Sequence, residues 1–97
     1  MSLKEYAVEC HAIANSKGWW DEDRSIPELL CLIHSEVSEA LEGYRNNNLR
    51  NFEEEIADVL IRVFDMAEHL HIDLDKVVTM KMEINRNREY RHGGKRI

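Results

Sequence analysis

The sequence predicts an all-α protein: a single domain over residues 1–97, folded as a four-helix bundle that dimerisation completes. Apolar residues recur at the three- and four-residue spacing of a helix in four segments, and the alternation typical of strands is not found. Each segment begins with a residue type that caps helices. These residues are Ser2, Ser25, Asn51 and Asp73.

The first helix is expected over residues 3–17. Ser2 and Glu5 have the spacing of a capping box, and Gly18 ends the periodic pattern. Trp19 and Trp20 follow directly, and only one of two adjacent aromatic side chains points inward easily to close the end of a core. We expect the other to be free to stack on a base or on a partner.

The second and third helices are expected to be joined by the Asn-rich residues 46–48. The second helix should begin with another capping box at Ser25 and Glu28 and run to about residue 45. The third should begin at Asn51 and reach about residue 70. Its apolar residues extend around more than one side of the helix. This predicts that the helix packs against another subunit as well as against its own chain.

The fourth helix is expected over residues 74–90, with Asp73 as its N-cap. Lys81, Asn85 and Arg88 recur along it at positions i, i+4 and i+7, so all three should project from one face. A solvated stripe of polar side chains is the ordinary interpretation of such a face. The alternative is a clamp for phosphate groups, because amines and guanidinium groups form charge-assisted hydrogen bonds to phosphate.

Two pairs of acids, three residues apart on the second and third helices, form the main candidate site. Residues on a helix three apart share a face, so each pair presents two carboxylates side by side. At about 100° per residue, Glu36 falls within the apolar stripe of its helix and Glu55 at the edge of the next stripe. Burying an ionised carboxylate without a partner is costly, so these positions indicate a metal, another cation or a proton.

If the two helices pack antiparallel, all four acids converge without an equal number of bases beside them. The acids are Glu36, Glu39, Glu55 and Asp58. A divalent cation is the natural compensation, and ligation by oxygen alone favours Mg²⁺, with Mn²⁺ as the alternative, over Zn²⁺.

Composition and charge restrict the class of function. A hydrophobic content of 43% with 33% charged residues is typical of a folded soluble protein. Neither a membrane-spanning run nor a signal peptide is evident, so we expect a cytoplasmic protein without a membrane partner. Residues 81–97 carry a charge of +4 and the preceding part −10, within a total of −6. This distribution argues against nucleic acid polymers and favours a small anionic ligand between metal ions and cationic side chains.

These segments resemble the MazG-like all-α nucleoside triphosphate pyrophosphohydrolases. Members of that family carry an E-x-x-E pair on one helix and an E-x-x-D pair on the next, and residues 35–42 and 54–60 are similar to the two motif blocks. The resemblance extends to the corner at residues 18–20 and to a K-x-x-x-N-x-x-R segment at residues 81–88. It therefore covers nearly the whole chain.

The resemblance implies Mg²⁺-dependent hydrolysis of nucleoside triphosphates, with dNTPs preferred, between the α and β phosphates. It makes the four acids the catalytic and metal-binding residues, and it implies that Lys81, Asn85 and Arg88 contact phosphates. His11 and Trp20 match positions near the nucleotide in the branch that resembles dCTP pyrophosphatases. Ser35 stands where many relatives have a Glu, which leaves the number of metal ions and the general base open.

Two other functions are compatible with the sequence. One is phosphoribosyl-ATP pyrophosphohydrolase, a related all-α activity, and the other is a non-catalytic metal-binding helical interaction protein. In each case a chain of 97 residues buries only a modest part of its surface by itself. We therefore expect a homodimer, or a homotetramer built as a dimer of dimers.

Overall fold

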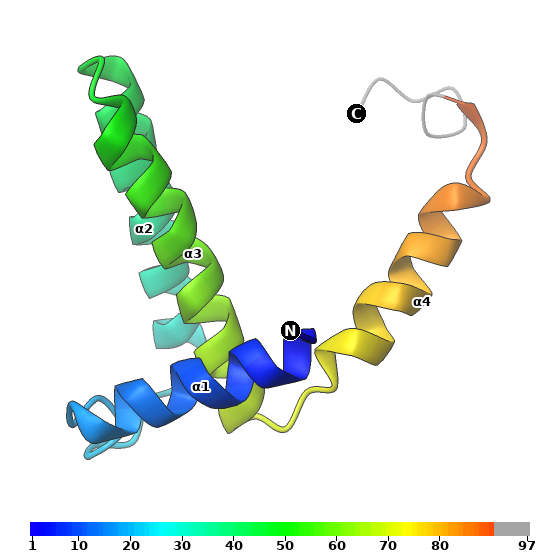
Figure 1. The fold of residues 1–97 in the computed structure, drawn as a ribbon, viewed down its shortest axis with the longest axis horizontal. Coiled ribbons are helices and arrows are strands. Elements are labelled where there is room, and N and C mark those ends of the chain that lie inside the picture. Colours follow the sequence, from blue (N-terminus) through cyan, green and yellow to red (C-terminus); the bar gives the residue numbers. More distant parts are fainter. Residues whose placement is uncertain (91–97) are drawn as a thin grey trace.

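The computed structural model describes residues 1–90. Its regular structure is entirely helical, which confirms the predicted all-α class with four helices (Figure 1). Of the basic end at residues 81–97, residues 91–97 lie outside the described residues. The helices are α1 Leu3–Ser16, α2 Ile26–Arg45, α3 Leu49–His69 and α4 Leu74–Arg86. Helices α2 and α3 form an antiparallel hairpin, α1 packs across α3, and α4 extends away on the other arm of a V.

The turn between α2 and α3 explains the Asn-rich connector. Asn47 adopts a left-handed backbone conformation with φ of 56°, which asparagine tolerates better than most residues. Gly43 is buried where the two helices approach each other closely. A Cβ atom there would lie 2.7 Å from Asn51 Nδ2 and 3.1 Å from the backbone nitrogen of Phe52. The absence of a side chain at Gly43 therefore permits the tight hairpin that aligns the two acidic pairs.

The N-termini of α1 and α2 differ in how fully their predicted capping boxes form. At α1, Ser2 Oγ accepts a hydrogen bond from Glu5 N at 3.0 Å, and Ser2 N donates to Glu5 Oε1 at 2.9 Å. At α2, Ser25 Oγ accepts from Glu28 N at 3.2 Å. The Glu28 carboxylate pairs with Arg24 at 2.7 Å instead, so the second box is only half formed.

Two predicted helix boundaries are wrong. Helix α3 begins before Asn51, because Asn48 Oδ1 accepts a hydrogen bond from Asn51 N at 3.1 Å and caps the helix earlier. Helix α4 ends at Arg86 rather than at residue 90, where Asn87 forms the C-cap and its side chain donates to the Glu83 carbonyl at 3.1 Å. Arg88 therefore lies beyond the helix and does not continue its regular face.

The start of α4 is attached to the start of α1. The carboxylate of Asp75 accepts hydrogen bonds from the backbone nitrogens of Leu3 and Lys4, both at 3.0 Å. These are two of the amides that the first turn of α1 leaves unpaired, so Asp75 caps α1 from another helix. The Lys4 ammonium also pairs with Glu68 on α3. A small polar junction thus joins α1, α3 and the first turn of α4.

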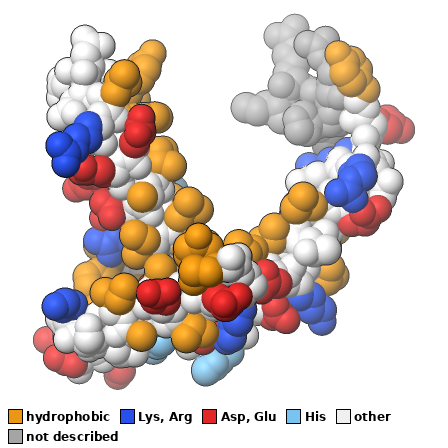
Figure 2. Space-filling view, viewed as in Figure 1, with side chains coloured by type: hydrophobic (Ala, Val, Ile, Leu, Met, Phe, Trp, Pro, Cys, Tyr) orange, Lys and Arg blue, Asp and Glu red, His pale blue; other side chains and the backbone are white. Residues whose placement is uncertain are grey.

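The apolar core of the single chain is thin. The buried apolar residues are Ala7, Leu29, Ala40 and Ala67, and within residues 1–90 no large side chain is fully buried. The radius of gyration is 15.9 Å, against about 12.5 Å for a compact domain of this length. Hydrophobic side chains gather along the inner sides of the V in Figure 2. The single chain thus leaves an extended apolar surface uncovered.

Exposed apolar residues are found on every helix, including the two that form the arms of the V. On α3 they include Ile56, Leu60 and Ile61, and on α4 they include Met80 and Ile84. None of the residues of α4 is buried. Within residues 1–90, no helix combines the length and the hydropathy needed to span a membrane.

Candidate functional site

The antiparallel hairpin brings three of the four predicted acids together. One carboxylate oxygen from each of Glu36, Glu39 and Glu55 lies within 4.8 Å of the other two. Glu36 is buried with 8% of its surface exposed, Glu55 is half-buried, and Glu39 is exposed. The cluster is therefore closed on the protein side and open to solvent at Glu39. Asp58 is not part of the cluster and instead lines the cavity beside it.

Glu55 carries the least compensated oxygen of this cluster. Its Oε2 atom is buried and has no hydrogen-bond partner among residues 1–90. The adjacent Glu36 carboxylate, burial and the adjacent Glu39 carboxylate together raise the pKa of Glu55 to about 7. Without a metal ion, Glu55 therefore holds a proton up to neutral pH. Three carboxylates, one of which has a buried oxygen without a partner, are a donor set that fits Mg²⁺ or Mn²⁺.

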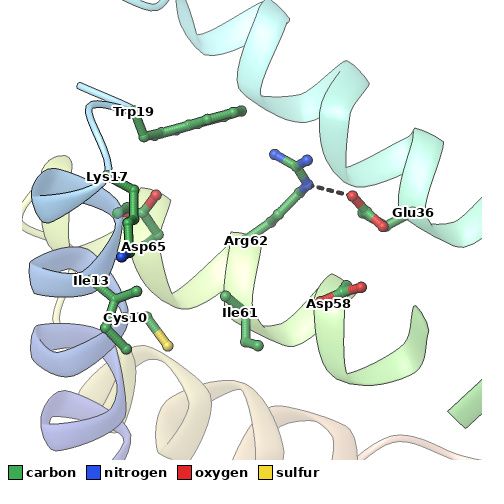
Figure 3. A pocket seen from close by; sticks show the side chains of 10 residues that line it. Cys10, Ile13, Lys17, Trp19, Glu36, Asp58, Ile61, Arg62 and Asp65 are labelled. Carbon is green, nitrogen blue, oxygen red and sulfur yellow. Dashed lines mark hydrogen bonds and ion pairs between the residues drawn. The ribbon is translucent and has the colours of Figure 1, made fainter. Parts of the chain in front are cut away.

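Glu36 keeps its negative charge because it has a cationic partner. Burial alone would raise the pKa of Glu36, but hydrogen bonds from Arg62 and from protonated Glu55 outweigh burial and lower it. Arg62 Nε donates to Glu36 Oε1 at 2.8 Å. Figure 3 shows the Arg62 guanidinium between this carboxylate and the Trp19 ring, whose centre is 4.9 Å away.

A cavity of about 480 Å³ lies beside the carboxylate cluster, between α1, α2 and α3 (Figure 3). Ile13, Ile61 and Trp19 supply apolar and aromatic walls, while Glu36 and Asp58 supply carboxylates. Because Glu36 belongs both to the cavity and to the cluster, a molecule bound here would contact both. The volume is in the range of sites for small organic ligands.

His11 and Trp20 meet at a buried aspartate on α3. Asp65 Oδ1 accepts a hydrogen bond from Trp20 Nε1 at 2.9 Å and lies 2.7 Å from His11 Nδ1. The Trp20 ring also stacks on His69, with ring centres 3.7 Å apart. Asp65 lines the cavity, whereas His11 and Trp20 do not. The two predicted nucleotide-binding residues thus support the wall of the cavity through Asp65.

The three predicted phosphate-binding residues are not close to the acids within the single chain. Lys81 and Asn85 are exposed on α4, and Arg88 is exposed beyond its end. Helix α4 forms the arm of the V opposite the α2–α3 hairpin (Figure 1). Within the single chain, Lys81, Asn85 and Arg88 therefore do not form one site with the acids.

From the sequence, Arg62 and Asp65 extend the polar stripe of α3, and two interpretations of Arg62 are open: neutralising acids or reaching a phosphate, or an ordinary ion pair within the helix. The structure pairs Arg62 with Glu36 on α2, whereas the contact of Asp65 with His11 and Trp20 was not predicted. Arg62 and Asp65 follow Asp58 on α3, at four and seven residues, so helical spacing was the available signal. The resemblance placed Trp20 near the nucleotide, with Trp19 as the alternative, and it is the Trp19 side chain that reaches the cavity. Adjacent residues point in different directions, and periodicity outside a helix does not tell which one faces inward.

The fold and the cluster define a class: helical proteins in which an antiparallel pair of helices gathers carboxylates beside a cavity of small-molecule size. A sequence model of the MazG nucleotide pyrophosphohydrolase domain matches residues 24–91, and the chain belongs to this family. The matched segment contains α2, α3 and α4, with both acidic pairs. Comparison with curated proteins and with solved structures gave no match. Membership indicates a hydrolase that acts on nucleotide pyrophosphate bonds.

Proposed function

We propose that this protein hydrolyses nucleoside triphosphates, with dNTPs preferred, between the α and β phosphates in a Mg²⁺-dependent reaction. The products are a nucleoside monophosphate and pyrophosphate. The observation that carries the proposal is the buried, unpartnered Oε2 of Glu55 inside a group of three carboxylates. Such an arrangement favours a divalent cation, and the family supplies the class of substrate.

Glu36, Glu39 and Glu55 would hold the cation, with Asp58 at the neighbouring edge of the cavity. When bound, Mg²⁺ or Mn²⁺ neutralises phosphate charge and favours the ionisation of water near neutral pH. The protein groups orient the triphosphate and exclude bulk water from the buried side of the cluster. Little covalent chemistry is required of them, because phosphoryl transfer depends mainly on positioning and electrostatics.

The nucleoside would occupy the cavity next to the cluster. Trp19 offers an aromatic surface for a base, and Ile13 and Ile61 complete the apolar walls. His11 and Trp20 would act from behind Asp65 by holding that carboxylate at the cavity wall. This arrangement is our interpretation of the resemblance to dCTP pyrophosphatases.

Lys81, Asn85 and Arg88 would contact the phosphates from a second subunit in a homodimer, or in a homotetramer built as a dimer of dimers. Two observations support this assembly: α4 diverges from the carboxylates of its own chain, and no residue of α4 is buried. Apolar residues of α4, among them Val77, Met80 and Ile84, are exposed and would pack against the partner.

The decisive experiment is a pyrophosphate-release screen with normal and modified dNTPs and NTPs, with phosphoribosyl-ATP included. We expect Mg²⁺-dependent release of pyrophosphate together with a nucleoside monophosphate. In ¹⁸O-labelled water the label should enter the monophosphate, because attack at the α phosphorus leaves the new oxygen there. Turnover of phosphoribosyl-ATP alone would support the alternative enzyme. A folded protein that binds metal and releases no product would support a non-catalytic interaction protein.

Metal binding should weaken as the pH falls below about 7, because Glu55 then holds a proton that the cation must displace. The apparent affinity for Mg²⁺ should fall about tenfold per pH unit when one proton is released for each ion bound. Titration calorimetry in two buffers with different ionisation enthalpies measures that proton directly. In Glu55→Gln the proton release should disappear, and a pH-independent affinity in the unmodified protein would contradict the prediction.

A further inference from the structure

Arg62 occupies an unusual position between the carboxylate cluster and the cavity. Its Nε donates to Glu36 at 2.8 Å, and its side chain is 29% exposed where that of Glu36 is 10% exposed. The guanidinium also lies over the Trp19 ring, with its central carbon 4.9 Å from the ring centre. One arginine therefore neutralises the most buried acid of the cluster and contacts the aromatic wall of the cavity (Figure 3).

Arg62 and a divalent cation would neutralise the same carboxylate. Each compensates the charge of Glu36, so the presence of one makes the other less favourable at that position. Two like charges near one another in a poorly solvated site repel strongly. A bound cation should therefore weaken the Arg62–Glu36 ion pair. The N–H groups of the guanidinium that donate to Glu36 would then be available to another acceptor.

The surroundings determine where the released guanidinium would go. Trp19 is held independently, because Arg24 stacks on its ring at 3.7 Å and Arg24 Nε donates to the Trp19 carbonyl at 2.8 Å. The ring therefore stays in place when Arg62 moves. Arg62 itself lines the cavity, so its donors would face the ligand bound there. Guanidinium groups bind phosphate oxygens by paired hydrogen bonds.

We propose that Arg62 is a substrate-positioning residue. In the metal-free protein it is paired with Glu36, and when a divalent cation is bound it is free to contact the triphosphate. This inference rests on the proposed function. It links the two ligands: the cation displaces the arginine, and the arginine then attracts the anionic substrate. Metal binding before nucleotide binding would thus prepare the site, and the protein without metal would present a neutralised site with low affinity for nucleotide.

The test is the substitution Arg62→Gln, with Arg50→Gln as the matched control. Arg50 lies on the same helix and is 90% exposed in an ion pair with Glu54, so its substitution removes the same charge away from the site. Calorimetry with Mg²⁺ and no nucleotide should give an affinity about tenfold tighter for Arg62→Gln, in the usual range of coupling between two ligands. Arg50→Gln should match the unmodified protein.

Opposite effects on the two ligands distinguish this role from a structural one. Arg62→Gln should bind Mg²⁺ more tightly yet bind the triphosphate more weakly, with a KM raised at least about tenfold. Without metal, the Tm of Arg62→Gln should be lower than that of the unmodified protein, because Glu36 loses its partner. Addition of Mg²⁺ should reduce this difference in Tm. Mg²⁺ affinity that is unchanged or weaker in a folded Arg62→Gln protein would overturn the proposal.

A second measurement does not depend on that variant folding. In the protein with Trp20→Phe, Trp19 is the remaining tryptophan, and its emission should change on Mg²⁺ addition as the guanidinium leaves the ring. If calorimetry detected Mg²⁺ binding while the Trp19 emission stayed unchanged, the release of Arg62 would be contradicted. Because these titrations contain no nucleotide, a failure of the pyrophosphate screen would disprove the proposed function without affecting this result.

Discussion

Glu55→Gln is expected to reduce metal-dependent pyrophosphate release at least about 100-fold, because the substitution replaces a central oxygen ligand by a neutral amide. The same change should make the metal-free protein more stable at about pH 8. At that pH Glu55 is ionised beside Glu36 and Glu39, with Oε2 buried and unpartnered. Glutamine has nearly the same shape and carries no charge that requires compensation.

The stability of the metal-free protein should depend on pH because the pKa of Glu55 is raised in the folded state. The folded protein holds the Glu55 proton up to a pKa of about 7, above the ordinary value of 4.5. Between these values the folded state binds more protons than the unfolded state, so stability falls as the pH rises. Glu55→Gln should remove this decline. Thermal unfolding of the metal-free proteins at about pH 5, 6, 7 and 8 measures the difference.

Glu53→Gln is the control for Glu55→Gln. Glu53 is exposed on the same helix, two residues earlier, and its substitution changes the net charge equally. It should retain activity and the pH dependence of the unmodified protein. If Glu55→Gln lost both activity and stability, the side chain would have a packing role, and if it retained activity, the assignment of Glu55 as a metal ligand would be wrong.

Lys81→Gln is expected to lower turnover of triphosphate about 100-fold without measurable loss of stability. Lys81 is exposed on α4, so its substitution leaves the packing of the chain unchanged. The expected loss is that of a preorganised cation which stabilises developing charge on the phosphates. Lys76→Gln is the matched control, because Lys76 is exposed near the start of the same helix. Steady-state kinetics and thermal unfolding of both variants test this expectation.

Mixing Lys81→Gln with Glu55→Gln should restore activity if each site takes its acids from one subunit and its lysine from another. When equal amounts are refolded together into dimers, half of the dimers are mixed, and each of these has one intact site. The recovered activity should therefore be about a quarter of that of the unmodified protein. Mixed dimers that remain inactive would place both residues in the same chain, and a stable monomer would exclude the shared site altogether.

Local signals predicted the helices well because each signal acts within a few residues. Ser2 and Glu5 are three apart and form their reciprocal hydrogen bonds as expected. The boundary errors at Asn48 and Asn87 arose where several adjacent residues can cap a helix, and the choice between them depends on backbone geometry. The position of Glu36 in an apolar stripe likewise predicted its burial, because helical periodicity determines which face is covered.

The sequence by itself predicted the fold class and the acids of the candidate site, because these depend on spacing along one helix at a time. The resemblance of its motif segments predicted the family. Tertiary structure decided which of the acids meet: Glu36, Glu39 and Glu55 cluster, while Asp58 turns to the cavity. It also decided that Arg62 pairs with Glu36 and that Trp19 rather than Trp20 faces the cavity. These relations depend on how α2 docks against α3 and on the path of the corner after α1, and no local pattern encodes either.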